Sequence, residues 1–198
     1  MKTRNGFVSN SSSSSFIIAL DKLPENAQEM HELLFNSSKE EMLQLYDFYD
    51  AISSFEIAEI VFRDITSKNE SVFNIQQLVY ELLCGCVDGI ENFYDSKFAR
   101  MNNEAENKLH EEARILGKRV YDDPDFSRMI DETYSTFYDI HNNIAMEDAK
   151  NVATMFLNSN KGKLVFSLSY SDNAGGIECQ IEHGNTFRNI PHIQISHH

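Results

Sequence analysis

The sequence has no tryptophan, only 3 prolines and 3 cysteines, and no long hydrophobic run among its 198 residues. Its longest purely apolar stretch, residues 16–20, is far shorter than the roughly 20 apolar residues of a membrane-spanning helix. Asn and Ser follow the first basic residues, where a signal peptide has its apolar segment. The sequence therefore predicts a soluble cytoplasmic protein without a membrane segment.

Cysteine is too scarce for a disulfide framework, because Cys84, Cys86 and Cys179 make an odd number. Cys84 and Cys86 are separated by one residue, whereas redox and zinc pairs normally have two or more between them. Both lie within an apolar helical pattern, so we expect buried, free thiols that act as small hydrophobic groups.

Positive charge is also scarce, since 17 basic residues face 31 acidic ones for a net charge of −14. Residues 21–162 hold 28 of the acidic and 13 of the basic residues, a net of −15. Such a field repels phosphate backbones and argues against general nucleic-acid binding. It suits a basic or nucleic-acid-binding protein as partner, although acidic helices can also serve solubility alone.

The hydrophobic content of 41%, with 14 Phe and 8 Tyr, is that of a globular protein. We expect one domain over residues 1–198, with three parts in sequence. These are a polar arm and strand in 1–20, an acidic helical region in 21–162 and C-terminal strands in 163–198.

Apolar residues recur at steps of three and four through most of the middle, which predicts a series of helices. Ser38 and Glu41 have the spacing of a capping box at the start of one of them. Pro124 can occupy the first turn of another. The expected helices cover residues 24–35, 38–52, 57–65, 75–83, 98–120, 124–137 and 149–157.

After Gly162 the apolar period changes from 3.6 to 2, which indicates strands at residues 164–170, 177–182 and 193–197. The apolar segment 16–20 also needs a strand partner. We therefore predict an α+β fold in which the helical middle covers one face of a small antiparallel sheet. The N-terminal strand and the C-terminal strands form this sheet.

The two ends of the chain carry a family resemblance. The start, KTRNGFVSNSSSSSF at residues 2–16, resembles an N-terminal signature shared by many uncharacterised proteins of bacteria and their phages. The end, with YSDN at 170–173, EHGN at 182–185 and PHIQISHH at 191–198, is similar to the close of one subgroup of them. The resemblance implies a bacterial or phage origin and a location in the bacterial host cytosol, but no activity.

Histidines gather at the C-terminal end, where imidazoles beside carboxylates can exchange protons or bind a transition metal. His183, His192 and Glu182 are the catalytic candidates. On alternating strands, His192 and His198 would share a face with Glu178, which would suit a divalent metal ion. The alternative is a polar sheet face at the chain end.

The serine-rich arm is a second candidate, because its hydroxyls and backbone amides could surround an anion with help from a cation. The residues concerned are Arg4, Ser11, Ser12 and Ser13. A flexible, solvated arm is the alternative. We expect the arm and the histidine-rich end to be neighbours, because one leads into the sheet and the other ends in it.

Three functions remain open. The preferred one is a non-enzymatic accessory protein that binds another protein through its acidic helical surface. The second is a small metal- or His-dependent, hydrolase-like enzyme with its site on the C-terminal strands. The third is a structural subunit of a larger assembly.

Overall fold

The computed structural model describes residues 13–44, 51–67, 74–171 and 176–197. Its contacts divide the chain into two compact units, which we call the sheet unit (residues 1–87 and 154–198) and the hairpin unit (residues 88–153). In chain order the elements are β1 (Ser13–Leu20), α1 (Ala27–Phe35), β2 (Met42–Leu43), β3 (Ile52–Ser53), α2 (Ser54–Ser67), α3 (Ile75–Leu83), the 3-10 helix η1 (Phe93–Asp95), α4 (Lys97–Ile115), the 3-10 helix η2 (Val120–Asp122), α5 (Pro124–Ser159), β4 (Leu164–Ser171), α6 (Gly176–His183) and β5 (His192–Ser196).

The fold is α+β, as predicted, with a sheet of order β4-β1-β5 in the sheet unit. The central strand β1 is antiparallel to both neighbours, and Ile18 lies opposite Phe166 on β4 and His192 on β5. Every residue of β1 after Ser13 is buried. The N-terminal strand therefore pairs with C-terminal strands, because its buried backbone N–H and C=O groups need hydrogen-bond partners on both edges.

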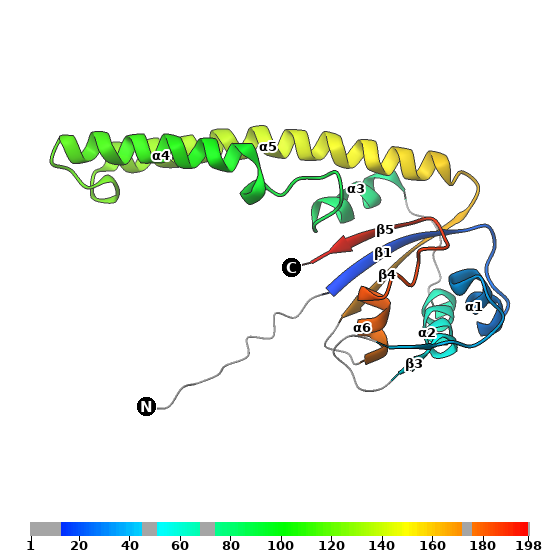
Figure 1. Cartoon of the computed structure of the whole chain (residues 1–198). Helices are drawn as coiled ribbons and strands as arrows, with labels where there is room; N and C mark the ends of the chain where they lie inside the picture. The colour runs from blue at the N-terminus through cyan, green and yellow to red at the C-terminus, as the bar shows by residue number, and fades with distance from the viewer. Residues whose placement is uncertain (1–12, 45–50, 68–73, 172–175, 198) are drawn as a thin grey trace, which may run out of the picture. The chain divides into compact units, whose positions relative to one another are not determined.

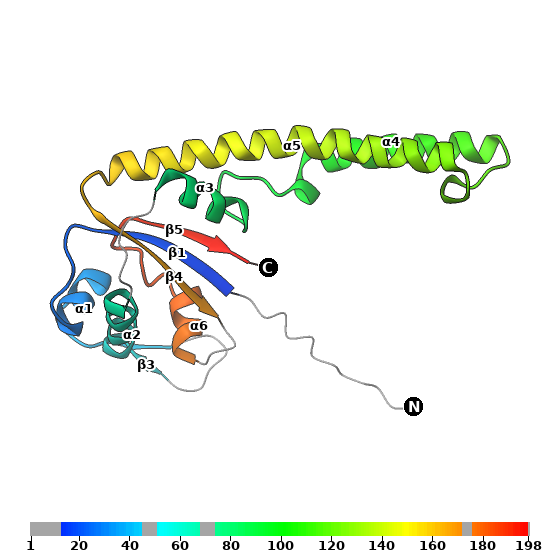
Figure 2. The ribbon, with the colours of Figure 1, turned by 180° about the vertical axis from the view of Figure 1, so that it is seen from behind.

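Helices lie on both faces of this sheet, not on one face as expected. Figures 1 and 2 show α1, α2 and α6 on one side and α3 on the other. On the first side, alternate β1 residues Phe16, Ile18 and Leu20 join a core with apolar residues of these helices, including Leu34 and Ile57. The alternation follows from the period of two in a strand.

The prediction of a strand at residues 177–182 is wrong, because this segment forms helix α6. Ile177 and Ile181 alternate with polar residues as in a strand, but they are also four residues apart, as on one face of a helix. Ile181 is fully buried in the core beside the sheet. In a run this short, periodicity could not distinguish the two structures.

The predicted helix over residues 38–52 is also wrong. The described part of this segment contains the short antiparallel strands β2 and β3, and residues 45–50 lie outside the described residues. The backbone N–H of Glu41 donates to Ser54 Oγ over 2.9 Å, and the N–H of Ser54 donates to the carbonyl of Glu41. These bonds connect Glu41 to the start of α2 and replace the expected capping box with Ser38.

The hairpin unit is built on α4 and α5, which are antiparallel neighbours. At one end the rings of Phe98 and His141 are 6.3 Å apart, and at the other Ala113 packs with Phe126 and Ile130. The Ser96 side chain caps α4 by accepting from two backbone N–H groups over 3.2 Å. Gly117, with φ +68°, follows the end of α4 and so shortens the helix predicted to reach residue 120.

Helix α5 begins at Pro124, as predicted, but it is one continuous helix of 36 residues. We expected two helices, over residues 124–137 and 149–157. The residues buried between them are His141 and Ala145, which are too weakly apolar to continue the hydrophobic period in the sequence. Among the helices of the described chain, none is long and apolar enough to span a membrane.

Candidate functional site

The predicted anion-binding arm lies largely outside the described residues, which include only Ser13 of its four candidates. Ser13 begins β1, and its backbone carbonyl accepts a 2.8 Å hydrogen bond from the N–H of His197. The end of the serine run and the C-terminal segment are therefore neighbours. Arg4, Ser11 and Ser12 remain untested as ligands.

A buried polar cluster connects β1, α6 and β5, and we call Ser14, Glu182 and Gln194 the Ser14 cluster. Ser14 Oγ donates to Glu182 Oε1 over 3.2 Å, and the Glu182 side chain is 0% exposed. Gln194 Nε2 lies 3.1 Å from the carbonyl of Glu182 and 3.3 Å from Ser14 Oγ. The second carboxylate oxygen of Glu182 is buried without a hydrogen-bond partner among the described residues.

The order of groups in this cluster does not suit nucleophilic catalysis. An activated serine needs the imidazole between hydroxyl and carboxylate, so that the imidazole can take the hydroxyl proton. Here Ser14 contacts the carboxylate directly, and His183 Nε2 lies 3.8 Å from the other oxygen of Glu182. The arrangement stabilises the packing of α6 on the sheet and provides no base for Ser14.

The opposite face of β1 carries a serine and imidazole in contact. Ser15 Oγ lies 3.0 Å from His197 Nε2 and 2.9 Å from Ser169 Oγ on β4. Ser15 is only 5% exposed, which leaves little room for a substrate carbonyl beside its hydroxyl. Sequence reasoning did not select His197, although strand alternation places it two residues from Ile195 on the same face.

The strand alternation that grouped the predicted metal ligands is wrong for one of them, and another cannot be placed. Glu178 lies on helix α6 instead of on a strand, and His198 lies outside the described residues. His192 is exposed on β5, and its Nδ1 donates to the carbonyl of Ile190 over 3.0 Å. Within the described ranges, no group of three His, Cys, Asp or Glu side chains could hold a metal ion.

Two further expectations concern buried groups. Cys84 and Cys86 are exposed, contrary to the prediction, because they follow the last turn of α3 instead of lying within it. Cys179 is buried, as expected.

The sequence did not indicate His31, which is buried with its Nε2 2.7 Å from Ser54 Oγ. Its ring packs beside Phe35, so its environment is that of the core.

Burial also affects Tyr170, the β4 residue opposite Ser14. Burial, and then the negative charge of Asp64, raise the pKa of the Tyr170 hydroxyl well above its usual value of 10.0. The phenol therefore stays protonated at neutral pH and is not a base.

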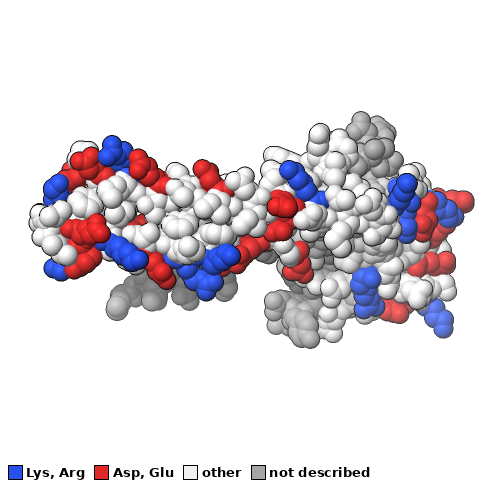
Figure 3. All heavy atoms as spheres, turned by 90° about the horizontal axis from the view of Figure 1, so that it is seen from above, with Lys and Arg blue, Asp and Glu red and all other residues white. Residues whose placement is uncertain are grey.

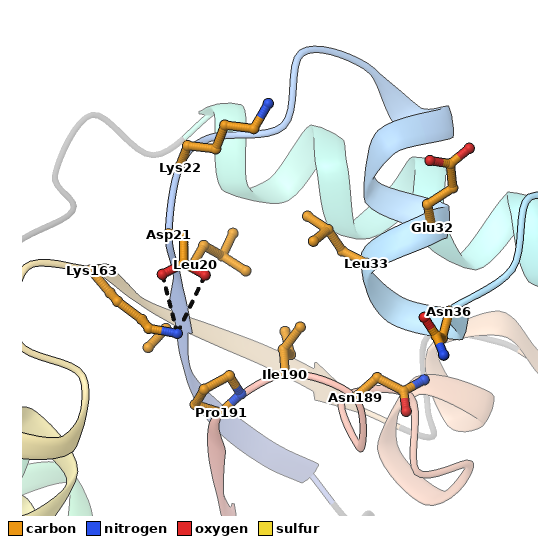
Figure 4. Close-up of a pocket in the computed structure, with 11 residues that line it drawn as sticks. Leu20, Asp21, Lys22, Glu32, Leu33, Asn36, Lys163, Asn189, Ile190 and Pro191 are labelled. Atoms are coloured by element: carbon orange, nitrogen blue, oxygen red, sulfur yellow. Dashed lines mark hydrogen bonds and ion pairs between the residues drawn. The ribbon is translucent and has the colours of Figure 1, made fainter.

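The sheet unit contains a cavity of about 590 Å³ between the end of β1, α1 and the segment before β5. Figure 4 shows Lys163 directed at Asp21, and their charged groups are 3.3 Å apart. Lys22 is paired with Glu29 outside the cavity lining, and Asn189 donates to the carbonyl of Leu34 over 2.7 Å. The cations that line this cavity, Lys22 and Lys163, already have carboxylate partners, so neither is free to bind an anionic ligand.

The hairpin unit presents a different kind of surface. It holds 15 acidic and 8 basic residues, a net charge of −7. Of the 17 large hydrophobic side chains exposed among the described residues, 10 lie in this third of the chain. They are Tyr94, Met101, Ile115, Leu116, Tyr121, Met129, Tyr138, Ile140, Ile144 and Met146.

The visible face of the hairpin unit has uncharged surface along its middle and charged side chains along both edges (Figure 3). One core cluster of the hairpin unit consists of Ala113, Val120, Phe126 and Ile130 with Leu109 packed against them. In a pair of helices, each helix buries only the face that contacts the other, so apolar residues on the remaining faces stay exposed. Exposed apolar residues bordered by charged ones are common at protein-binding surfaces, so the surface of the hairpin unit is the best candidate site.

The Ser14 cluster provides a test of its structural role. Ser14→Ala should lower the free energy of unfolding by about 1.5–3 kcal/mol, because the buried Glu182 carboxylate loses the hydroxyl that donates to it. Urea unfolding measures this change. In a Glu182→Met background the same substitution should cost much less, since no charge is left unpaired. Equal costs in both backgrounds would show that the hydroxyl does not stabilise the carboxylate.

Comparison with known proteins gives no further assignment: no family model matches the chain, and neither a curated protein nor a solved structure matches it.

Proposed function

We propose that the chain is a bacterial or phage accessory protein that binds another protein through the surface of its hairpin unit. The supporting observation is the coincidence, on α4, α5 and their connections, of exposed apolar side chains and a net charge of −7. Buried apolar area supplies affinity, and complementary charge accelerates association and selects the partner. A basic protein, or one with a nucleic-acid-binding surface, has this complementary charge.

The resemblance of the two chain ends to bacterial and phage proteins supports the proposed origin, and with it a location in the bacterial cytosol. The acidic surface argues against binding nucleic acid directly, because both would carry negative charge. In the Ser14 cluster no imidazole lies between the serine hydroxyl and the carboxylate, so the cluster does not provide the activated nucleophile that a hydrolase of this kind needs. We therefore favour binding over catalysis.

Site-specific photo-crosslinking tests the proposal. Benzoylphenylalanine is placed at Tyr121 in the hairpin unit or at Tyr80 in the sheet unit, which are 71% and 68% exposed. In a bacterial lysate, the probe at Tyr121 should give discrete crosslinks to a basic protein, and these should fade as NaCl rises from about 0.05 to about 0.5 M. The probe at Tyr80 is the control for random capture.

The expected pattern depends on the location of the binding surface. Crosslinks of equal intensity from both positions would contradict the proposal, because they would show no preference for the hairpin unit. A discrete product only from Tyr80 would place the partner on the sheet unit. Products that are insensitive to salt would argue against charge as the basis of selection.

A further inference from the structure

A groove of about 400 Å³ runs between α4 and α5 on one side of the hairpin unit. Both helices contribute to it, and its lining combines apolar residues and threonines with three charged residues. The residues that line it are Ala105, Lys108, Leu109 and Glu112 on α4, and Met129, Glu132, Thr133 and Thr136 on α5.

The two threonines do not make the groove polar. Thr133 Oγ1 donates to the carbonyl of Met129, and Thr136 Oγ1 donates to the carbonyl of Glu132, both over 2.7 Å. Their hydroxyls are therefore satisfied within α5 and need no partner in the groove. Together with the apolar residues Ala105 and Leu109, they form a lining that favours contact with hydrophobic side chains.

The apolar lining continues beyond the groove along both helices. Ile140 and Ile144 follow Thr136 at steps of four, and Met101 precedes Ala105 by four, so helical spacing places them on the same sides of α5 and α4. These three side chains are 42%, 43% and 46% exposed. Helix α4 has 19 residues and is therefore about 28 Å long, enough to lie beside roughly five turns of another helix.

The charges along the groove identify the occupant. Asp125, Glu132 and Asp139 are spaced by seven residues and so line one side of α5, next to the apolar stripe. Arg128 pairs with the first two over 3.3 and 3.7 Å, and Lys108 is the one cation among the lining residues. Asp139 and the lining residue Glu112 are in no ion pair among the described residues, so they can meet a cation of the partner. A second copy would bring another hairpin unit of charge −7 against this one, which charge repulsion disfavours.

We infer that this groove binds a single amphipathic helix of a basic protein, with apolar residues in the groove and Lys or Arg against its carboxylate edges. The inference rests on the proposed function and specifies its partner. The bound helix completes a three-helix arrangement, which buries the apolar face that α4 and α5 leave open. This is the helix-in-groove mode of recognition, in which residues at i, i+3, i+4 and i+7 anchor the peptide.

The test uses the full-length protein and a synthetic helical peptide with leucines at i, i+3, i+4 and i+7 and lysines elsewhere. Fluorescence anisotropy should show salt-sensitive binding of this peptide. A peptide of the same composition in scrambled order should bind at least about tenfold more weakly, because it lacks an apolar face. The same leucine pattern with glutamates in place of lysines should not bind.

Matched variants then locate the binding. Ala105→Arg places a cation in the groove, whereas Asn107→Arg adds the same charge two residues later, about 200° around α4. Ala105→Arg should weaken peptide binding roughly tenfold or more, and Asn107→Arg at most about twofold. Thr136→Arg, at an exposed position on α5, should repeat the effect of Ala105→Arg without disturbing the core.

Each contrary outcome has a distinct meaning. Absence of peptide binding, or equal effects of Ala105→Arg and Asn107→Arg, would overturn the inference. So would a protein dimer in sedimentation that Ala105→Arg dissociates, because the occupant would then be a second copy. If Tyr121 crosslinks persist in Ala105→Arg and Thr136→Arg, the proposed function stands and the groove is not the binding site. Peptide binding in the groove without any lysate crosslinks would support the groove and contradict the proposed function.

Discussion

Phe166→Ala should lower the free energy of unfolding by about 3–5 kcal/mol, measured by urea unfolding of the full chain. Phe166 is 2% exposed on β4 and lies opposite Ile18, which is completely buried on the central strand. Removing the ring loses its transfer free energy and leaves a cavity that the sheet cannot close, because strand pairing holds its neighbours in place. A loss of this size is a large part of the 5–15 kcal/mol typical of a folded domain.

The matched control is Tyr80→Ala, which also removes an aromatic ring, from an exposed position on α3. Its cost should stay below about 0.5 kcal/mol. Similar losses for both variants would mean that Phe166 does not lie in the main core. They would also contradict the strand register that places it against Ile18.

The sequence predicted the sheet well where a segment had only one way to bury its apolar residues. Residues 16–20 are apolar without interruption, so we expected a buried strand with partners, and they form the central strand. The covering of both faces of this sheet was not predicted. Helix α3 was also predicted to its residue bounds, because Leu78 and Leu82 repeat on one face and are both fully buried. In these segments, local pattern and tertiary burial agree.

Prediction failed where the pattern was short or depended on a distant partner. Residues 177–182 fit both a strand and a helix, and the packing of Ile181 against the sheet decides for the helix. Ser38 and Glu41 could form a local cap, but the backbone of Glu41 pairs with Ser54 instead, 13 residues away. Local sequence patterns do not indicate which residues distant in the chain will come into contact.

The candidate site was predicted in part. The approach of the serine run to the C-terminal end followed from their positions at the two ends of one sheet, and the Ser14–Glu182 and Ser15–His197 contacts show it. Which side chains meet depends on α6: Glu178 lies on this helix, so the strand alternation that placed it on one face with His192 does not apply. The negative charge of the middle of the chain could be counted from the sequence. The groove could not be predicted, because it exists only where α4 packs against α5.

The largest effect expected in the hairpin unit concerns Phe126, near the start of α5. Its ring is 8% exposed and packs with Ala113, Val120 and Ile130, while Lys118 Nζ lies 5.7 Å from the ring centre. Phe126 is the largest member of this cluster, so removing its ring takes away most of the contacts among them. Phe126→Ala should therefore lower the local free energy of unfolding by about 3–5 kcal/mol. The connection between α4 and α5 should then lose its packing against the two helices.

Hydrogen exchange measured by mass spectrometry locates this loss. In Phe126→Ala, amides at the end of α4, in η2 and in the first turns of α5 should lose protection, whereas those of β1 and β4 should not, because the Phe126 cluster and the core around β1 and β4 share no residue. Tyr121→Ala removes a ring that is 71% exposed, five residues earlier, and should leave exchange nearly unchanged. Loss of protection throughout the chain would instead show that the hairpin unit and the sheet unit unfold together.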